Sequence, residues 1–436
     1  MLQVNVIGGG LAGCEAAYYL AQKGIKVRLW EMRPQKTTPV HKTADLAELV
    51  CSNSLKSEQP NTAQGLLKRE MRILGSLLLS CAERARVPAG SALAVDRELF
   101  ARLVSQTILS CPSIELCRQE LSSVPAGELS IVATGPLTSE ALASDLKQLG
   151  GEENLFFYDA VAPSITAGSL DMNKVFRASR YGKGSADYLN CPLDREEYEL
   201  FYENLINADI KAGHSIDKGL FFNACMPVEV LARLGKDALR YGPMRPVGLE
   251  IPGSSKRAYA VLQLRQEDQA GTIYGMVGFQ TRMRWGEQIR VFRLIPGLEQ
   301  ADFVRYGVMH RNTYINSPKL LEPSLQCKKR PEIFFAGQIT GVEGYMESAA
   351  TGIIAGINVS RWLQGKELLI PDKATIIGAL LDFISNSSSK DFQPINANFG
   401  LMPPLDPPIR DKSQRYLAYV ERALNKMREF SESLLN

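Results

Sequence analysis

The chain has few histidines, and it has no run of apolar residues long enough to form a membrane helix. Only three of its 436 residues are histidines, and none lies near a pair of cysteines, so no metal site is expected. No apolar run approaches the roughly 20 residues that a membrane span needs. The eight cysteines show no Cys-x-x-Cys spacing, which is typical of reduced thiols in a cytoplasmic protein. A net charge of +3 neither requires nor excludes a nucleic-acid partner.

Two further signals are missing. No secretory signal precedes the first predicted strand, because Met1 leads directly into it. A second Gly-x-Gly-x-x-Gly is also absent: the nearest string, Gly182-Lys183-Gly184, follows a charged stretch and lacks the third glycine. The region from 155 to 300 is therefore not expected to bind a second nucleotide, which argues against a disulfide-reductase type of enzyme.

A dinucleotide-binding fingerprint occupies residues 3–31. A strand, a glycine-rich turn, a helix, a second strand and an acidic residue follow one another in the order of a Rossmann unit. The glycines permit the tight turn, the approach of a pyrophosphate and the packing of helix on strand, and the helix N-terminus attracts phosphates. Glu31 could accept both ribose hydroxyls, and its charge would repel a 2′-phosphate, so the site suits FAD or NAD. The other predicted cofactor residues here are Gly8, Gly9, Gly10, Leu11, Ala12 and Gly13.

Two later segments favour FAD over NAD. A buried strand predicted within 128–139 ends at Thr134 and Gly135, and a later apolar run ends at Gly337 and Gln338 before a helix. In flavoproteins with two dinucleotide-binding domains, the mid-chain segment lies against the cofactor and the late strand–helix junction lies beneath the flavin. The helix N-terminus at that junction would face the end of the flavin where negative charge accumulates on reduction.

The composition changes near residue 155, after which the chain is richer in aromatic residues, prolines and charges up to about residue 300. Before that point, apolar spacing predicts one helix over 63–86 and another that begins at Asp96. The pattern predicts an α/β fold, in which a Rossmann-like FAD-binding domain is interrupted by an inserted α+β domain. The predicted division is 1–155 and 300–436 for the FAD-binding domain, with a closing helix from about 411, and 156–299 for the insertion.

Longer strings resemble a known family. The motifs GGGLAGCEAA (8–17), ELVCSNSLKS (48–57), FFNACMPVEVLA (221–232) and GVEGYMESAATGIIAG (341–356) are similar to those of the bacterial folate- and FAD-dependent tRNA (uracil-5-)-methyltransferases, the TrmFO family. The stretch 277–318 shares the resemblance, which extends from residue 3 to about 405. The sister group, the GidA-type tRNA-modifying flavoproteins, has the same overall plan.

The resemblance implies methylation of C5 of the T-loop uridine, position fifty-four of tRNA. The carbon donor would be 5,10-methylenetetrahydrofolate, reduced FAD would carry the methylene and supply the hydride, and NADH or NADPH would reduce the flavin. C5 of uracil is a poor nucleophile until a thiolate adds to C6, so a cysteine, a flavin and a folate site suffice without a metal. The family motifs point to Cys225 as that nucleophile and to Cys51 as the thiol that protects the flavin adduct or acts as general base.

The resemblance also suggests folate and tRNA contacts. His310 could stack on a pteridine, with Arg311 and Asn312 binding the polar edge or carboxylates of the folate, although a surface histidine bonded to a carbonyl is equally compatible. In the inserted domain, arginines around an aromatic residue suit phosphate contacts with base stacking, but a solvated strand face would look the same. The predicted tRNA contacts are Arg282, Arg284, Trp285 and Arg290. The tRNA T-arm and folate are the expected partners, with no membrane and no obligate protein partner.

Three other functions remain open. A GidA-like enzyme would build a larger group on a wobble uridine, and methyl formation at the T-loop would distinguish it. A nicotinamide-dependent flavin oxidoreductase of a small molecule would show no salt-dependent binding of tRNA. In a non-catalytic flavin-bound regulator, replacing Cys51 or Cys225 by alanine would have no consequence.

Overall fold

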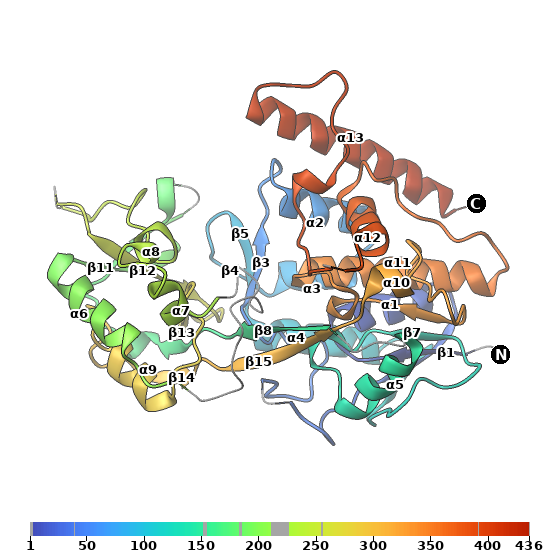
Figure 1. The fold of residues 1–436 in the computed structure, drawn as a ribbon, viewed down its shortest axis with the longest axis horizontal. Helices are drawn as coiled ribbons and strands as arrows, with labels where there is room; N and C mark the ends of the chain where they lie inside the picture. Colours follow the sequence, from blue (N-terminus) through green and yellow to red (C-terminus); the bar gives the residue numbers. More distant parts are fainter. Residues whose placement is uncertain are drawn as a thin grey trace.

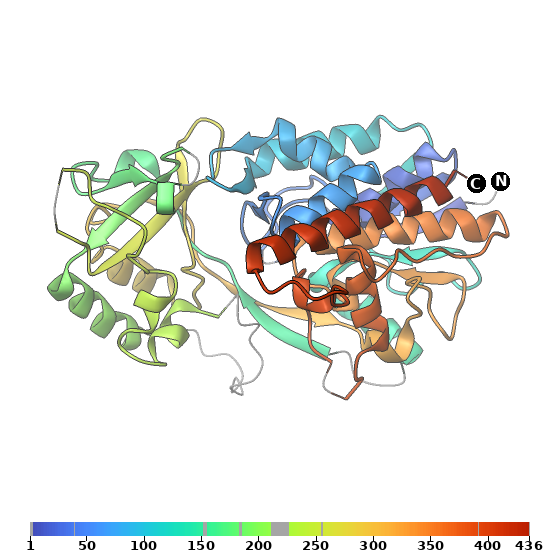
Figure 2. The same cartoon turned by 90° about the horizontal axis from the view of Figure 1, so that it is seen from above.

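The computed structural model describes residues 3–38, 40–150, 155–182, 185–210, 226–253, 256–390 and 392–435. Two bodies of unequal size make up the molecule (Figure 1). The larger body contains both ends of the chain, and the smaller one is formed by the middle of the sequence. The strands β8 (Leu155–Ala160) and β15 (Met309–Tyr314) pair in antiparallel fashion and run between the bodies (Figure 2).

A parallel sheet of five strands forms the centre of the larger body. Its strand order, β16-β7-β1-β2-β6, places the late strand β16 beside β7, so that segments about 200 residues apart become neighbours. The apolar side chains of β1 are buried on both faces, as expected for a parallel sheet covered by helices. The strands are β1 (Gln3–Ile7), β2 (Lys26–Trp30), β6 (Ile114–Cys117), β7 (Ser130–Val132) and β16 (Ile333–Phe335).

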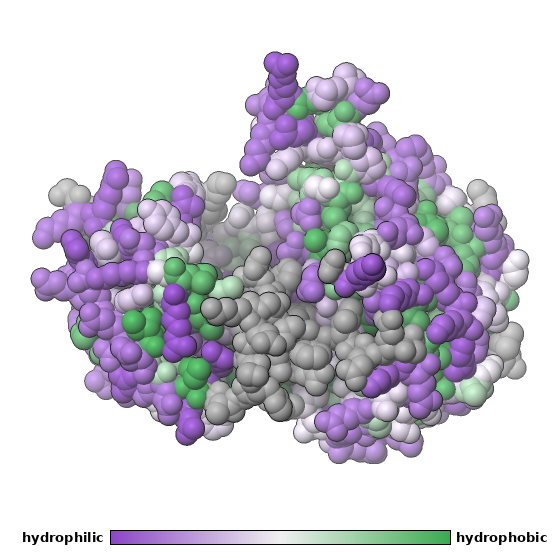
Figure 3. Space-filling view, viewed as in Figure 1, coloured by the Kyte–Doolittle hydropathy of each residue, from purple (hydrophilic) through white to green (hydrophobic). Residues whose placement is uncertain are grey.

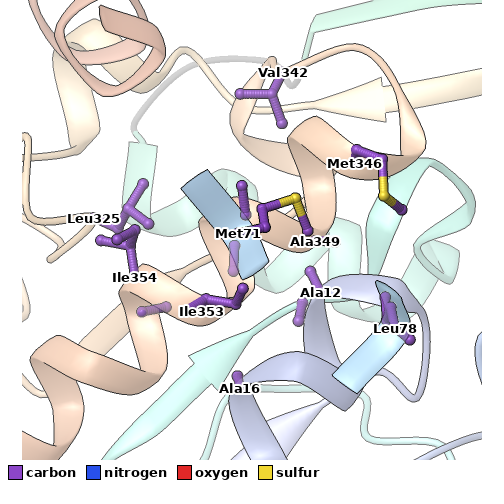
Figure 4. Close-up of a cluster of buried hydrophobic side chains, with 14 of the residues drawn as sticks. Ala12, Ala16, Met71, Leu78, Leu325, Val342, Met346, Ala349, Ile353 and Ile354 are labelled. Carbon is purple, nitrogen blue, oxygen red and sulfur yellow. The ribbon is translucent and has the colours of Figure 1, made fainter. Parts of the chain in front are cut away.

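The helices α1 (Leu11–Gln22) and α11 (Tyr345–Leu363) pack directly against each other. Small residues permit this approach: Ala12 of α1 lies near Ala349 of α11 (Figure 4), and Ala16 lies beside Gly356. A Cβ atom added to Gly352 would lie 2.2 Å from the carbonyl oxygen of Ala12. Since that neighbour is backbone, no side chain could move aside to make room.

Among the remaining elements of the larger body, local sequence patterns predicted some boundaries correctly and missed others. The single helix expected over 63–86 is wrong, because Gly75 has a φ of +77° and the Ser76 hydroxyl caps a new helix. The expected start at Asp96 is confirmed, since its carboxylate accepts a bond from the Leu99 N–H. The elements are α2 (Ala63–Ile73), α3 (Leu77–Arg84), α4 (Arg97–Leu109), α5 (Glu140–Gly150), α10 (Ser317–Leu320), α12 (Ile376–Asn386), α13 (Lys412–Ser433), the 3-10 turns η1 (Gly135–Leu137), η5 (Gln338–Thr340) and η6 (Phe399–Leu401), and a small sheet of β3 (Ser54–Ser57), β4 (Arg86–Val87) and β5 (Ala92–Val95).

The smaller body has its own antiparallel sheet and its own apolar core. The predicted α/β fold with an inserted α+β part is therefore confirmed. The exact division stays a prediction, but the six-stranded sheet extends to β14, past residue 299. Its strands are β10 (Phe176–Ala178), β11 (Tyr188–Leu193), β12 (Ala260–Gln266), β13 (Ile273–Met276), β9 (Ser164–Thr166) and β14 (Phe303–Arg305), with helices α6 (Arg195–Ile206), α7 (Val228–Ala232), α8 (Ala238–Tyr241) and α9 (Trp285–Phe292) and the 3-10 turns η2 (Ala167–Ser169) and η3 (Arg180–Gly182).

Polar side chains are prominent on one face of the molecule. Hydrophilic residues cover most of the face shown in Figure 3, and hydrophobic ones gather only in small areas. Within the part of the chain that the structure describes, no helix is both long and apolar enough to cross a membrane.

Replacing Gly352 by alanine should destabilise the larger body. The added methyl group would overlap the backbone of α1, and overpacking of this kind costs about 1–3 kcal/mol. Thermal unfolding would measure the effect as a lower melting temperature. Gly286→Ala in α9 is the control, because its Cβ would meet no atom within 4 Å, and it should not lower the melting temperature. An unchanged melting temperature in Gly352→Ala would show that α1 and α11 can separate at no cost.

Candidate active site

A cavity at the carboxyl ends of β1, β2, β7 and β16 brings the three predicted cofactor segments together. Ligands of open α/β sheets bind at this edge. The cavity, together with the open space at its mouth, spans about 1010 Å³. All predicted cofactor residues except Gly13 line it, namely Gly8, Gly9, Gly10, Leu11, Ala12, Glu31, Thr134, Gly135, Gly337 and Gln338.

The glycines of the first turn have different physical roles. Gly13 is required by the fold, because its Cβ would lie 1.8 Å from the carbonyl oxygen of Gly8. Gly10 is the N-cap of α1, and a Cβ there would meet nothing within 4 Å. No side chain caps this helix, so its first N–H groups are available to an anion. The turn therefore fits the pyrophosphate of FAD, with open space at Gly10.

The carboxylate of Glu31 is already fully engaged within the protein. It accepts bonds from the Gly9 N–H (3.0 Å) and from the Arg33 N–H (3.0 Å), Nε (2.9 Å) and Nη2 (3.2 Å). Burial by itself would raise the pKa of Glu31, but the bonds and charge of Arg33 bring it below its ordinary value. A carboxylate has about four acceptor positions. The predicted bonds to both ribose hydroxyls would thus have to replace bonds that Glu31 now accepts from Arg33 or Gly9.

Tyr345 holds the turn that contains Cys51. Its hydroxyl oxygen accepts bonds from the N–H groups of Cys51 (2.8 Å) and Ser52 (3.1 Å). Tyr345 is the first residue of α11 and lines the cofactor cavity together with Val50. Cys51 itself is half-buried, and its thiol lies 3.9 Å from the carbonyl oxygen of Ala160. Sequence reasoning did not assign Tyr345 a role, although the GVEGY string contains it.

The inserted body holds the same turn from the other side. Arg265 of β12 donates from Nε to Oδ1 of Asn53 (2.7 Å) and from Nη2 to the hydroxyl of Ser52 (3.1 Å). The Asn53 amide in turn donates to the carbonyl oxygens of Val95 (3.0 Å) and Gln266 (2.9 Å). The position of Cys51 consequently depends on both bodies. The second predicted cysteine, Cys225, lies outside the described residues.

The predicted folate residues belong to β15, which packs against η1 and η5 beside the cavity. The side chains of His310 and Arg311 lie outside what the structure describes. The side chain of Asn312 is only 1% exposed, and neither its oxygen nor its nitrogen has a hydrogen-bond partner among the described residues. A buried amide without partners is unfavourable. A ligand edge with one donor and one acceptor would satisfy it.

The predicted tRNA residues differ in accessibility. Trp285 is 54% exposed and stacks on Tyr306, with ring centroids 5.1 Å apart. The Arg284 side chain beside it is 61% exposed. Arg290 forms an ion pair with Glu287 on the surface of α9, with its Nη2 2.8 Å from Oε2 of the glutamate.

Arg282 points inward instead. Its side chain is mostly buried, and its Nε lies 3.6 Å from the fully buried carboxylate of Glu229. Glu229 also accepts bonds from the Thr281 hydroxyl (2.9 Å) and from the Arg282 N–H (3.1 Å). This arrangement ties the start of α7 to residues 281–282, so Arg282 supports the inserted body from within.

The fold and the cavity define a flavoprotein of the GidA class. The family model described as glucose inhibited division protein A matches residues 3–367. Among solved structures, Aquifex aeolicus GidA in its form I crystal is similar with a TM-score of 0.72 over 99% of this chain and 76% of that chain. At 17% sequence identity, this similarity supports only the assignment of the fold.

Relatives that match the full length of the chain identify its family within this class. The methylenetetrahydrofolate–tRNA-(uracil-5-)-methyltransferase TrmFO of Syntrophomonas wolfei is 88% identical over 436 residues, covering 100% of both chains. The TrmFO of Pelotomaculum thermopropionicum is 58% identical over 432 residues, covering 99% of both. The chain belongs to the TrmFO family, a result that confirms the predicted family.

Alanine substitutions at Gly13 and Gly10 should separate folding from cofactor binding. Gly13→Ala should lower the melting temperature of the protein without flavin, because the methyl group overlaps the Gly8 carbonyl. Gly10→Ala should keep that melting temperature but lose flavin, because its methyl group enters the space left for the pyrophosphate. Flavin absorbance and thermal unfolding measure the two effects. Unchanged FAD affinity in Gly10→Ala would contradict this placement of the pyrophosphate.

Removing the Tyr345 hydroxyl should loosen the Cys51 turn. In Tyr345→Phe two backbone N–H groups lose their acceptor, which costs about 1–3 kcal/mol per buried group. Chemical denaturation would measure the loss of unfolding free energy. Tyr202→Phe is the control, since no hydrogen bond of its hydroxyl is found among the described residues. Equal stability of the two variants would argue against the role of Tyr345.

Proposed function

We propose that this chain methylates C5 of the T-loop uridine of tRNA, at position fifty-four, and takes the carbon from 5,10-methylenetetrahydrofolate. The observation that carries the proposal is full-length identity of 88% to a TrmFO methyltransferase. The cavity supports it, because the three predicted cofactor segments meet there and Tyr345, which lines it, binds the main-chain N–H of Cys51.

The residues of the cavity would bind FAD in a defined orientation. The N-terminus of α1 would bind the pyrophosphate, and Gly337 and Gln338 would lie at the flavin end with Tyr345. When bound, FAD carries the one-carbon unit and supplies the electrons that complete the methyl group. NADH or NADPH is the proposed source of those electrons.

The two cysteines would perform the chemistry on the uracil ring. Addition of the Cys225 thiolate to C6 makes C5 nucleophilic, and elimination of the same thiolate restores the aromatic ring after transfer. Cys51 would serve as the base for the C5 proton or protect the bound one-carbon unit. The hydrogen bonds of the turn to Tyr345 and Arg265 support this role, since they orient the Cys51 turn from both bodies.

The substrates would approach along the junction of the bodies. Folate would occupy the space beside β15, where Asn312 has an unsatisfied amide and where His310 and Arg311 follow the family pattern. The T-arm of tRNA would contact the exposed side chains of Trp285 and Arg284. We further propose a cytoplasmic location, because tRNA is the substrate, and no obligate protein partner.

Labelling of the RNA product would test the proposal. We expect FAD-loaded protein, unmodified tRNA transcript, carbon-labelled methylenetetrahydrofolate and NADPH to yield labelled 5-methyluridine at the T-loop. The label should disappear in Cys225→Ala and Cys51→Ala. It should remain in Cys111→Ala, the control, which alters a half-buried cysteine outside the cavity.

The same experiment separates the alternatives. A label on the wobble uridine in place of the T-loop would indicate a GidA-like reaction. NADPH oxidation without labelled RNA, from a protein that does not bind tRNA, would indicate a small-molecule oxidoreductase. Full activity in both cysteine variants would contradict the proposed chemistry.

A further inference from the structure

A second cavity, which we call the junction cavity, lies between the two bodies. Together with the open space at its mouth it spans about 620 Å³, and it shares Val50 with the cofactor cavity. Lys42 and Arg305 provide its charged wall, and Trp285 and Tyr306 provide an aromatic wall. The remaining lining residues are valines, so no carboxylate from the described residues lines it. The junction cavity is therefore suited to an anion attached to an aromatic group.

A buried arginine adds positive charge behind this wall. Arg97 is only 8% exposed, and its Nη2 donates to Glu267 at 2.6 Å. Its Nε and Nη1 have no hydrogen-bond partner within the described part of the chain. Burial lowers the pKa of Lys42 and of Arg305, and the nearby charge of Arg97 lowers both further. These three cations are therefore close enough to repel one another.

Of the neighbouring carboxylates, Glu267 neutralises Arg97 and Glu48 is engaged by other groups. Glu267 pairs with Arg97, and its other oxygen accepts a bond from the Ser164 hydroxyl at 2.7 Å. Glu48 is bonded to Arg33 at 3.1 Å and to the main-chain N–H of Lys42 at 2.8 Å. Among the described residues, neither the Lys42 ammonium nor the Arg305 guanidinium has an ion pair with a carboxylate. Lys42 is exposed and Arg305 is half-buried, so both cations can attract an anion that enters the cavity.

We propose that the junction cavity binds a phosphodiester group of the tRNA strand that carries the target uridine, with a base stacked on the Trp285–Tyr306 pair. Phosphate contacts with base stacking are the usual mode of binding single-stranded RNA. A polymer fits better than a small ligand, because Trp285 and the adjoining Arg284 are exposed and extend the site onto the surface. This inference rests on the proposed function and deepens it.

The salt dependence of tRNA binding tests the phosphate contact. We expect Lys42→Gln and Arg305→Gln each to weaken binding and to reduce the slope of log Kd against log salt by about 0.7, the value for one phosphate that is no longer neutralised. Arg305→Lys should retain the slope, which separates lost charge from a folding defect. Arg195→Gln in α6 is the control, because it removes one exposed charge from the same body, and it should behave as the wild type.

Removing the aromatic side chain of Trp285 should change tRNA binding in a different way. Trp285→Leu should weaken tRNA binding by about tenfold, because one base no longer stacks, while the salt slope stays that of the wild type. Weaker affinity with an unchanged slope marks stacking, whereas a reduced slope marks a phosphate contact. A reduced slope in Trp285→Leu, or an unchanged one in both charge variants, would overturn the proposal.

The kinetics of the other substrates complete the test. Unchanged tRNA binding with a raised KM for methylenetetrahydrofolate would assign the junction cavity to a folate carboxylate, and a raised KM for NADPH would assign it to a dinucleotide. Either result overturns the tRNA assignment. If the charge variants change the salt slope as predicted but the wild type forms no 5-methyluridine, only the proposed function is rejected. If the wild type forms 5-methyluridine but both charge variants keep its salt slope, only the assignment of the junction cavity is rejected.

Discussion

The close packing of α1 on α11 is the constraint on which the rest of the structure depends. Gly352 has no side chain where it meets the backbone of Ala12, so the two helices touch directly. This packing joins the first Rossmann unit to a helix more than 300 residues later in the chain. It places the N-termini of both helices at one cavity, α1 where a pyrophosphate would bind and α11 where Tyr345 reaches the Cys51 turn.

The Cys51 turn shows how the two bodies cooperate. Tyr345 binds its N–H groups from the FAD-binding body, and Arg265 binds Ser52 and Asn53 from the inserted body. A movement of the inserted body would therefore displace the thiol relative to the cofactor cavity. The inserted body thus contributes to the geometry of the Cys51 turn.

Charge is distributed unevenly around the site, although the whole chain carries only +3. The Glu31 carboxylate accepts bonds from Arg33 and Gly9, and Arg33 is also paired with Glu48, so two carboxylates share this cation. At the junction of the bodies, Arg97 keeps N–H groups without a partner among the described residues, beside Lys42 and Arg305. The charged lining of the junction cavity therefore consists of Lys42 and Arg305.

The sequence by itself determined the features that depend on local backbone geometry. Gly8, Gly10 and Gly13 mark a turn whose spacing implies strand, turn and helix, and Asp96 marks a helix start because its side chain caps its own helix. The break at Gly75 was missed, because apolar spacing continues across it and only the positive φ interrupts the helix.

Only the tertiary structure decided which polar groups meet. Tyr345 lies 294 residues from Cys51, and Arg265 lies 212 from Asn53, so no local pattern could pair them. Arg282 and Arg284 look alike in the sequence, yet one is turned toward the buried Glu229 and the other is exposed. Periodicity and glycine spacing constrain the backbone of a segment, whereas the partner of a side chain depends on how distant segments pack.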